Sequence, residues 1–166
     1  HNGDPLTAAA VKFSLERIKD PATASPGATH LREVASVEAI DEHTLKIVTK
    51  RPFAPMLMSL TRYETSIVSE RAVKEAGADY GSKAAVGTCP FKFTSWSRGD
   101  KVTLEKFDSY FRGPASLDTV VYRGIPEDAT RLVELESGGV ELIPGNFPYQ
   151  EFANIEKNEK YLTYKV

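Results

Sequence analysis

Apolar side chains near the start of the chain recur every three or four positions, which is the spacing of one face of an α-helix. The residues with this spacing are Ala8, Val11, Leu15 and Ile18. We therefore predict a helix over residues 8–19, with the Thr7 hydroxyl as its N-cap. Pro21 ends this helix, and residues 21–29, which are rich in Ala, Ser, Pro and Gly, are predicted to form a loop.

Two segments with the period-two alternation of β-strands follow, at residues 33–40 and 44–50. The polar residues 41–43 between them predict a tight turn, and therefore an antiparallel hairpin. Two short helices are expected next, one beginning near Pro55 and one over residues 70–76.

The second half of the chain combines alternating segments with two further helical patterns. Strands are predicted at 91–97, 101–107, 119–125, 140–143 and 161–166, and helices at 127–137 and 149–156. A stretch of small residues at 80–85 precedes these elements and predicts a boundary near residue 85. The pattern as a whole predicts an α+β fold, with mixed α/β elements in which short helices pack on mixed β-sheets.

Composition narrows the possible partners. The chain has 166 residues, of which 41% are hydrophobic and 27% charged, as in globular domains. Its 21 basic and 23 acidic residues almost balance, which gives no electrostatic argument for binding nucleic acid. The longest unbroken apolar run, residues 8–11, is far shorter than the ~20 residues that span a bilayer, so no membrane insertion of this segment is expected.

Reactive groups are few. Cys89 is the single cysteine, which excludes an intrachain disulfide and a multi-cysteine zinc site. None of the three histidines, His1, His30 and His43, shows a recognisable local signature with Cys89. We therefore expect no catalytic residue, no metal site and no cofactor, and predict that the protein is not an enzyme. A thiol-dependent hydrolase or transferase using Cys89 is the alternative hypothesis.

Arg62 is the charged residue that the sequence singles out. It follows the short helix that begins near Pro55 and stands beside Tyr63, just before an apolar segment. A guanidinium group at the boundary of an element can hold a ligand carboxylate with its planar fork. An arginine there can equally cap the C-terminus of the helix in solvent, and Tyr63 can equally be a packing residue. Both interpretations remain open at this stage.

Six groups of segments, in order along the chain, together resemble one protein family. They are HNGDPLTA at 1–8 with VKFSL at 11–15, VEAID at 37–41 with TL at 44–45, RPFAP at 51–55, VGTCPF at 86–91, YFRGP at 110–114 with LD at 117–118, and IPEDATR at 125–131 with SGGVEL at 137–142. This order resembles the solute-binding proteins of ABC importers for peptides, nickel and related solutes, extracellular solute-binding protein family 5.

The resemblance implies a fold and a function. It implies a partial lobe of a periplasmic-binding-protein type II-like fold, with residues 1–85 in the smaller subdomain of the first lobe and residues 86–166 returning into the larger one. The second lobe is then absent, and the chain is an internal fragment. It implies binding of a small peptide, or of a carboxylate or metal-chelate ligand, in a periplasmic or lipid-anchored extracellular protein that delivers its ligand to ABC permease subunits. An inactive structural subdomain is a further alternative for the isolated piece.

The resemblance also bears on single residues. In nickel-binding relatives an arginine matching Arg62 faces the cleft and contacts carboxylates of a metal chelator, which implies a ligand-binding role for Arg62. Tyr63 is a candidate only through its position beside Arg62. Cys89 replaces a glycine of the family pattern, and a side chain there is expected to clash or to force another backbone angle. Ala10 and Gly139 also depart from that pattern, which has acidic residues there.

Overall fold

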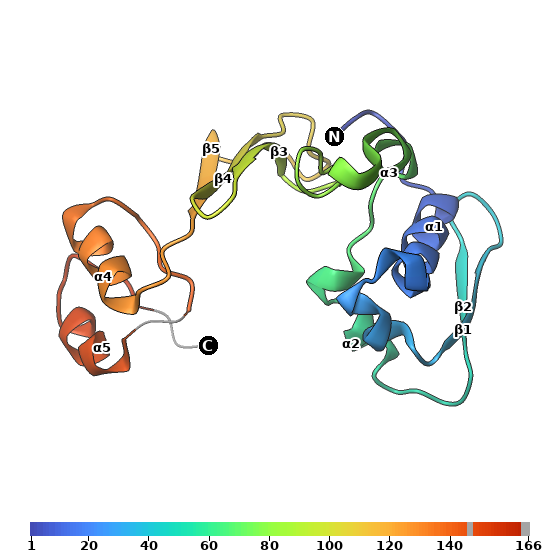
Figure 1. The fold of residues 1–166 in the computed structure, drawn as a ribbon, viewed down its shortest axis with the longest axis horizontal. Helices are drawn as coiled ribbons and strands as arrows, with labels where there is room; N and C mark the ends of the chain where they lie inside the picture. Colours follow the sequence, from blue (N-terminus) through green and yellow to red (C-terminus); the bar gives the residue numbers. More distant parts are fainter. Residues whose placement is uncertain (146–147, 164–166) are drawn as a thin grey trace. The chain divides into compact units, whose positions relative to one another are not determined.

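The computed structural model describes residues 1–145 and 148–163 (Figure 1). The chain divides into two compact units, which we describe separately. Unit 1 contains residues 1–96 and 102–121, and unit 2 contains residues 97–101 and 122–166.

Unit 1 opens with helix α1, Ala8–Lys19, which has the predicted bounds. The Thr7 hydroxyl accepts a hydrogen bond from the Ala10 backbone N–H at 3.3 Å, so the predicted N-cap is confirmed. Ser14 is buried in this helix; its hydroxyl accepts from the Val68 N–H at 3.0 Å and donates to the Ala10 carbonyl at 2.8 Å. This side chain therefore joins α1 to the segment that precedes α3.

The predicted loop at 21–29 is wrong in part, because two 3₁₀ helices occupy it: η1, Pro21–Thr23, and η2, Pro26–Leu31. The Asp20 carboxylate accepts from the Ala22 N–H at 2.9 Å, and the Ser25 hydroxyl accepts from the Gly27 N–H at 3.2 Å. A capping side chain followed by proline, whose fixed φ suits the first helical position, starts each of these short helices.

The predicted hairpin is present as β1, Val34–Ala39, and β2, Leu45–Thr49. The strands are antiparallel, with Val37 opposite Ile47 and Ala39 opposite Leu45. Figure 1 shows α1 beside this hairpin. The core of unit 1 lies between α1, η2 and β1 and consists of Leu15, Ile18, Leu31, Val34 and Val37.

Short elements continue the chain. They are α2, Met56–Leu60, η3, Tyr63–Thr65, α3, Glu70–Ala76, and η4, Gly77–Asp79. Both helices that the sequence predicts here are confirmed. Gly77 takes a positive φ of 52° where α3 ends, a conformation that glycine adopts without strain.

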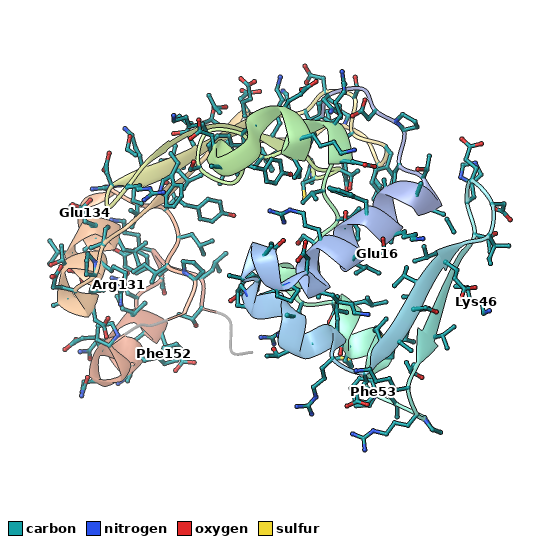
Figure 2. The ribbon with its side chains drawn as sticks, turned by 45° about the vertical axis from the view of Figure 1, so that its right-hand side comes forward. Glu16, Lys46, Phe53, Arg131, Glu134 and Phe152 are labelled. Atoms are coloured by element: carbon teal, nitrogen blue, oxygen red, sulfur yellow. The ribbon has the colours of Figure 1, made fainter. Side chains whose placement is uncertain are left out.

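The other elements form a small sheet and two helices. The strands are β3, Phe91–Ser97, β4, Lys101–Lys106, and β5, Thr119–Arg123, in the order β3-β4-β5, and the helices are α4, Asp128–Ser137, and α5, Tyr149–Glu156. Figure 2 labels Arg131 and Glu134 on α4. Glu134 accepts a hydrogen bond from Arg123 of β5 at 2.6 Å, which joins strand and helix within unit 2.

Two predicted strands are not observed. Residues 140–143 and 161–163 have irregular backbone, and residues 164–166 of the predicted last strand lie outside the described residues. An isolated apolar run forms a strand only when a neighbouring strand takes up its backbone hydrogen bonds, and the described residues offer these runs no such neighbour. The mixed α and β composition with short helices is otherwise as predicted. Within the described part of the chain, no helix has the length and apolar character needed to cross a membrane.

Candidate functional site

Arg62 and Tyr63 lie at the start of η3, where the chain turns after α2. The buried Thr65 hydroxyl donates to the Ser59 carbonyl at 3.0 Å and to the Arg62 carbonyl at 2.8 Å, so one side chain fixes the backbone on both sides of the turn. The Ser66 hydroxyl donates to the Tyr63 carbonyl at 2.6 Å. A buried donor that serves two carbonyls makes this turn costly to deform.

Both predicted site residues border the same cavity. Its volume is about 470 Å³, and its floor consists of apolar side chains of α1 and β2 that also pack on the core of unit 1. The lining residues are Val11, Leu15, Leu45, Ile47, Leu60, Thr61, Arg62, Tyr63, Thr65, Ser66 and Ile67. The Arg62 side chain is 52% exposed and Tyr63 is 81% exposed, so both stand at the rim and not in the interior.

A buried carboxylate stands behind Arg62. The Glu64 side chain is only 10% exposed, and its Oε2 lies 3.5 Å from Arg62 Nε. Its Oε1 lies 3.8 Å from His30 Nε2, on the η2 side. The pKa of Glu64 is below its ordinary value mainly because its own backbone N–H donates to the carboxylate, with further lowering by a hydrogen bond from the Tyr63 side chain and by the charges of Arg62 and His30, although burial opposes the shift. Glu64 is therefore an anion at neutral pH, and the nearest cation that faces the cavity is Arg62.

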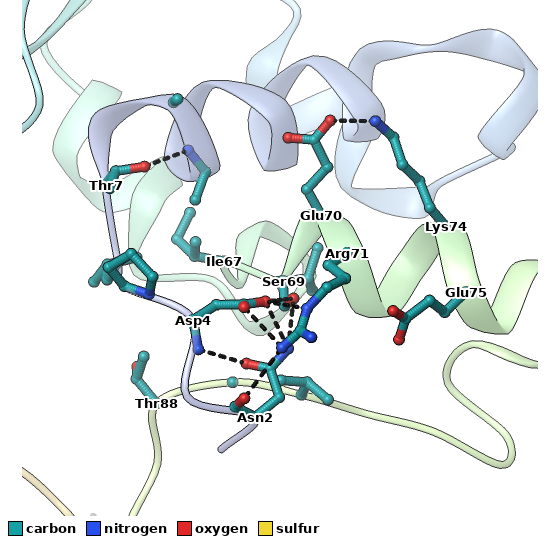
Figure 3. Close-up of a pocket in the computed structure, with 17 residues that line it drawn as sticks. Asn2, Asp4, Thr7, Ile67, Ser69, Glu70, Arg71, Lys74, Glu75 and Thr88 are labelled. Carbon is teal, nitrogen blue, oxygen red and sulfur yellow. Dashed lines mark hydrogen bonds and ion pairs between the residues drawn. The ribbon is translucent and has the colours of Figure 1, made fainter.

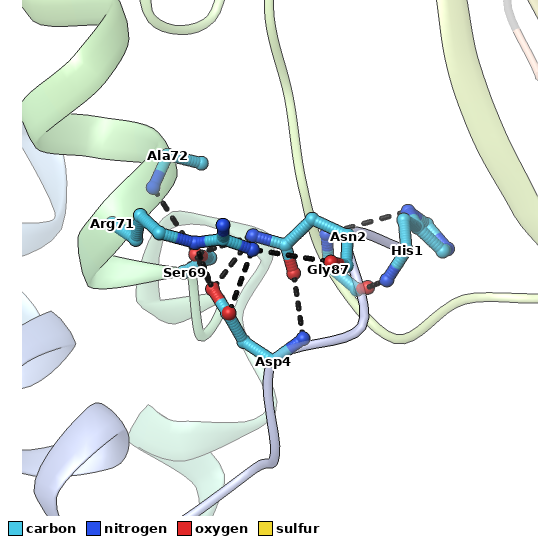
Figure 4. A network of polar contacts seen from close by, with 7 residues as sticks. All are labelled: His1, Asn2, Asp4, Ser69, Arg71, Ala72 and Gly87. Atoms are coloured by element: carbon cyan, nitrogen blue, oxygen red, sulfur yellow. Dashed lines mark hydrogen bonds and ion pairs between the residues drawn. The ribbon is translucent and has the colours of Figure 1, made fainter.

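A second cavity, of about 450 Å³, lies between the start of the chain, α3 and residues 86–88 (Figure 3). Its polar groups already bind one another. Asp4 accepts hydrogen bonds from Asn2 at 2.7 Å, Ser69 at 2.9 Å and Arg71 at 3.1 Å (Figure 4). The pKa of Asp4 is lowered chiefly by the Arg71 hydrogen bond, against the effect of burial, with help from Ser69 and Asn2. This network links the first residues to α3. Because Asp4 already accepts these hydrogen bonds within the protein, its carboxylate does not need a donor from a ligand.

Cys89 does not form a reactive pair in the structure. It is exposed, and the His1 ring contacts its backbone carbonyl, with Nε2 at 2.9 Å from that oxygen. His1 Nδ1 accepts from the Gly87 N–H at 3.3 Å, so both ring nitrogens are used by backbone groups. Cys89 does not take a positive φ. Among residues 1–145 and 148–163, no group of three or more His, Cys, Asp or Glu could hold a metal ion.

Sequence reasoning missed Glu64 and Gly27. Gly27 is buried in η2, where an added Cβ would lie 2.7 Å from the Glu64 carbonyl oxygen and 3.0 Å from Glu64 Cβ. This close approach of η2 to η3 joins residues 37 positions apart in the sequence, and no local pattern reveals it. The alternation of Arg62 and Glu64 about Tyr63 was the one available signal, because it places an anion and a cation next to each other.

Comparison with known proteins identifies the family of this chain. The family described as bacterial extracellular solute-binding proteins, family 5 Middle, matches residues 1–166. The chain belongs to this family. Glutathione-binding protein GsiB of Escherichia coli O157:H7 is 33% identical over 160 residues, which are 95% of this chain and 31% of that protein.

Solved structures agree with the family. The chain is similar to the periplasmic binding protein AgaA in complex with agropinic acid from A. tumefaciens R10, with 36% identity, a TM-score of 0.85 and coverage of 96% of this chain and 32% of that one. It is also similar to the periplasmic binding protein DppA from Helicobacter pylori in complex with peptide STSA, with 32% identity, a TM-score of 0.77 and coverage of 92% and 33%. The chain therefore spans about a third of the length of these relatives.

These likenesses confirm two predictions. The predicted family is correct, and the fold is that of part of a lobe of a periplasmic binding protein. The family consists of solute-binding proteins and not of enzymes, so the thiol-enzyme alternative finds no support among the relatives.

Proposed function

We propose that the full-length protein containing this chain is the solute-binding component of an ABC import system, and that this chain supplies one wall of its ligand cleft. The observation that carries the proposal is the half-exposed guanidinium of Arg62 at the rim of a cavity with an apolar floor, in a chain of this family. An apolar cavity with a single charged group at its edge is typical of small-ligand sites.

The ligand class follows from the chemistry of the rim. Arg62 presents a planar fork of donors, which suits a carboxylate, and Tyr63 adds an exposed aromatic ring beside it. Relatives of this chain bind glutathione, a peptide or an opine, all of which carry carboxylates. We infer that the ligand is a short peptide, a glutathione-like peptide or another carboxylate-bearing solute, including a metal chelate, with its carboxylate on Arg62.

The remaining parts of the proposal follow from the family. Residues 1–85 belong to the smaller subdomain of a first lobe and residues 86–166 to the larger one, and a second lobe closes over the ligand and excludes water. The protein works outside the cytoplasmic membrane, in the periplasm or on a lipid anchor, and passes its ligand to the permease subunits of the importer.

Binding of ligand to the folded state raises thermal stability by an amount that grows with the ratio of free ligand to its dissociation constant, which gives the test. We expect the melting temperature of the full-length protein to rise with at least one of glutathione, agropinic acid and the peptide Ser-Thr-Ser-Ala. The Arg62→Ala variant should lose that rise, and its melting temperature without ligand should be somewhat lower because Glu64 loses its nearest cation. An unchanged melting temperature across all three ligands would contradict the proposal.

We infer further that Cys89 performs no catalysis. An unactivated exposed thiol should react with iodoacetamide at pH 7 at the rate of a model thiol, because only the small thiolate fraction reacts. Labelling much faster than the model thiol would instead favour the thiol-enzyme alternative. Measuring that rate against pH separates the two.

A further inference from the structure

The carboxylate of Glu64 is unusual because it is buried and yet incompletely hydrogen-bonded. Its Oε2 has no hydrogen-bond partner among the described residues, and its closest cation is Arg62 Nε at 3.5 Å. A buried carboxylate oxygen normally has donors around it, since an unsatisfied one is costly. Arg62, whose Nε faces this oxygen at 3.5 Å, is the cation placed to offset that cost.

We propose that Glu64 is the positioning residue of the ligand site: it holds Arg62 by Nε and so directs the two terminal Nη groups to the ligand carboxylate. This inference rests on the proposed function of Arg62. An arginine can bind a carboxylate in two ways. It uses either its side, through Nε and one Nη, or its end, through both Nη atoms. With Nε facing Glu64, the end of the guanidinium remains for the ligand, and binding is end-on.

The backbone around Glu64 is fixed from two sides, which makes it a rigid anchor. Thr65 binds the Ser59 and Arg62 carbonyls from the α2 side. On the other side, Gly27 lets η2 come so close that a single added methyl group would lie 2.7 Å from the Glu64 carbonyl oxygen. A functional side chain holds its geometry when its neighbours are locked in this way.

The charges near Glu64 support the same assignment. Arg62 faces Oε2 at 3.5 Å, and His30 faces Oε1 at 3.8 Å with its side chain half-buried. The Arg62 contact is longer than the ~2.7–2.9 Å of a strong charge-assisted hydrogen bond, so Glu64 orients the guanidinium without using its donors fully.

Two opposite results are possible when Glu64 loses its charge, and this makes the proposal testable. If Glu64 acts only as a nearby negative charge, Glu64→Gln should strengthen binding of an anionic ligand. If Glu64 positions Arg62, the same variant should weaken binding because the guanidinium loses its orientation. The probe pair is glutathione and its diethyl ester, which lacks both free carboxylates.

We expect the full-length protein to prefer glutathione to the diethyl ester. Glu64→Gln should raise the dissociation constant for glutathione about two- to fivefold, the size expected for an ion pair without a close hydrogen bond, and should leave that for the ester unchanged. Glu16→Gln, the same change on the exposed face of α1, should alter neither constant, and the melting temperatures without ligand show whether either variant is misfolded. Equal or tighter binding of glutathione by Glu64→Gln would overturn the proposal while leaving the proposed function intact.

A second measurement needs no ligand. The Nε–H proton of Arg62, observed by NMR, should exchange with water more slowly than that of an exposed arginine. Glu64→Gln should abolish this protection, and Glu16→Gln should not change it. If the wild-type protein binds neither probe, glutathione is not its ligand, and this measurement still decides the role of Glu64. Fast exchange of the Arg62 Nε–H in the wild-type protein would overturn the role.

Discussion

The two units of the chain use their apolar side chains in different ways. In unit 1, α1 buries Leu15 and Ile18 against η2 and β1. In the described part of unit 2, Ile155 is the one buried hydrophobic residue, and α4 has none. Both α1 and α4 carry the pattern of an amphipathic helix, so the pattern predicts a helix but not a partner for its apolar face.

The difference has a physical consequence for stability. Removal of apolar surface from water is the main favourable term in folding, so unit 1 has the larger driving force. The described contacts that join β5 to α4 in unit 2 are largely polar, as in the hydrogen bond from Arg123 to Glu134. The stable part of the chain is therefore the part that positions Arg62 and Tyr63.

The largest expected effect comes from the core of unit 1. Leu31 is 0% exposed and lies in the buried cluster, so Leu31→Ala should reduce the free energy of unfolding by about 2–5 kcal/mol, through lost burial and the cavity left behind. Urea unfolding of the 166-residue chain, followed by circular dichroism, measures this loss.

Val133 of α4 provides the matched control in unit 2. It is 61% exposed, and Val133→Ala should change the free energy of unfolding by no more than about 0.5 kcal/mol. Equal losses in the two variants would show that α4 is packed as firmly as the core of unit 1, and the comparison between the units would fail.

The second effect concerns two glycines, neither of which has a positive φ. Gly27→Ala should cost about 1–3 kcal/mol, because the new Cβ would stand 2.7 Å from the Glu64 carbonyl oxygen and force η2 and η3 apart. A Cβ added at Gly124 in unit 2 would meet its nearest atom, the Asp100 carbonyl oxygen, at 3.4 Å, an ordinary contact. Gly124→Ala should therefore be nearly neutral in the same urea experiment. A neutral Gly27→Ala would mean that η2 and η3 are not closely packed.

These contacts also show how far sequence reasoning reaches. The bounds of α1 follow from local signals, the Thr7 cap and the spacing of apolar residues, and the structure agrees with them. The Ala, Ser, Pro and Gly content of residues 21–29 predicts a loop and does not reveal the two 3₁₀ helices. Asp20 and Ser25, each before a proline, are the start signals of these helices. Local capping chemistry carries more information than the proline and glycine content of a segment.

The site was predictable only in part. Arg62 stands out because its planar fork of donors, at the boundary of an element, suits a ligand carboxylate, and the structure places it at a cavity rim. That cavity joins α1, β2 and η3, and the anion behind Arg62 is packed by Gly27 of η2. Such long-range contacts depend on tertiary packing, which no periodicity in the sequence encodes.

A third comparison tests two hydroxyl groups. Thr65→Val keeps the shape of the side chain but removes the hydroxyl donor of the Ser59 carbonyl, whereas the Arg62 carbonyl keeps the backbone N–H of residue 65 at 3.0 Å, and the change should cost about 1–2 kcal/mol. Ser137 in α4 is exposed, and its hydroxyl donates only to Glu134 of its own helix, at 3.2 Å. Ser137→Ala should lie within about 0.5 kcal/mol of the wild type, because water replaces the lost partner. Comparable losses would show that the turn before η3 is no more constrained than the end of α4.

The smallest effect is expected from the ion pairs, and it depends on pH. The pKa of Asp4 in the folded chain is below its ordinary value, mainly because Arg71 donates to it. A depressed pKa means that the carboxylate contributes stability above its unfolded-state pKa, and that this contribution is lost as the pH falls through the lower folded-state value. The stability difference between wild type and Asp4→Asn should therefore be constant from pH 7 to about pH 5, begin to fall near pH 4, and disappear only below the lowered folded-state pKa of Asp4.

Glu134→Gln removes the corresponding carboxylate of unit 2 and completes the comparison. Asp4 accepts from three side chains, whereas Arg123 is the side-chain donor to Glu134 in the described contacts, so the change at Asp4 should be the larger at neutral pH. Urea midpoints of both variants between pH 7 and pH 3 measure the two differences. If the Asp4→Asn difference persisted unchanged at pH 3, the Asp4 hydrogen bonds would stabilise unit 1 without the charge of the carboxylate. The charge would then not distinguish the polar contacts of unit 1 from those of unit 2.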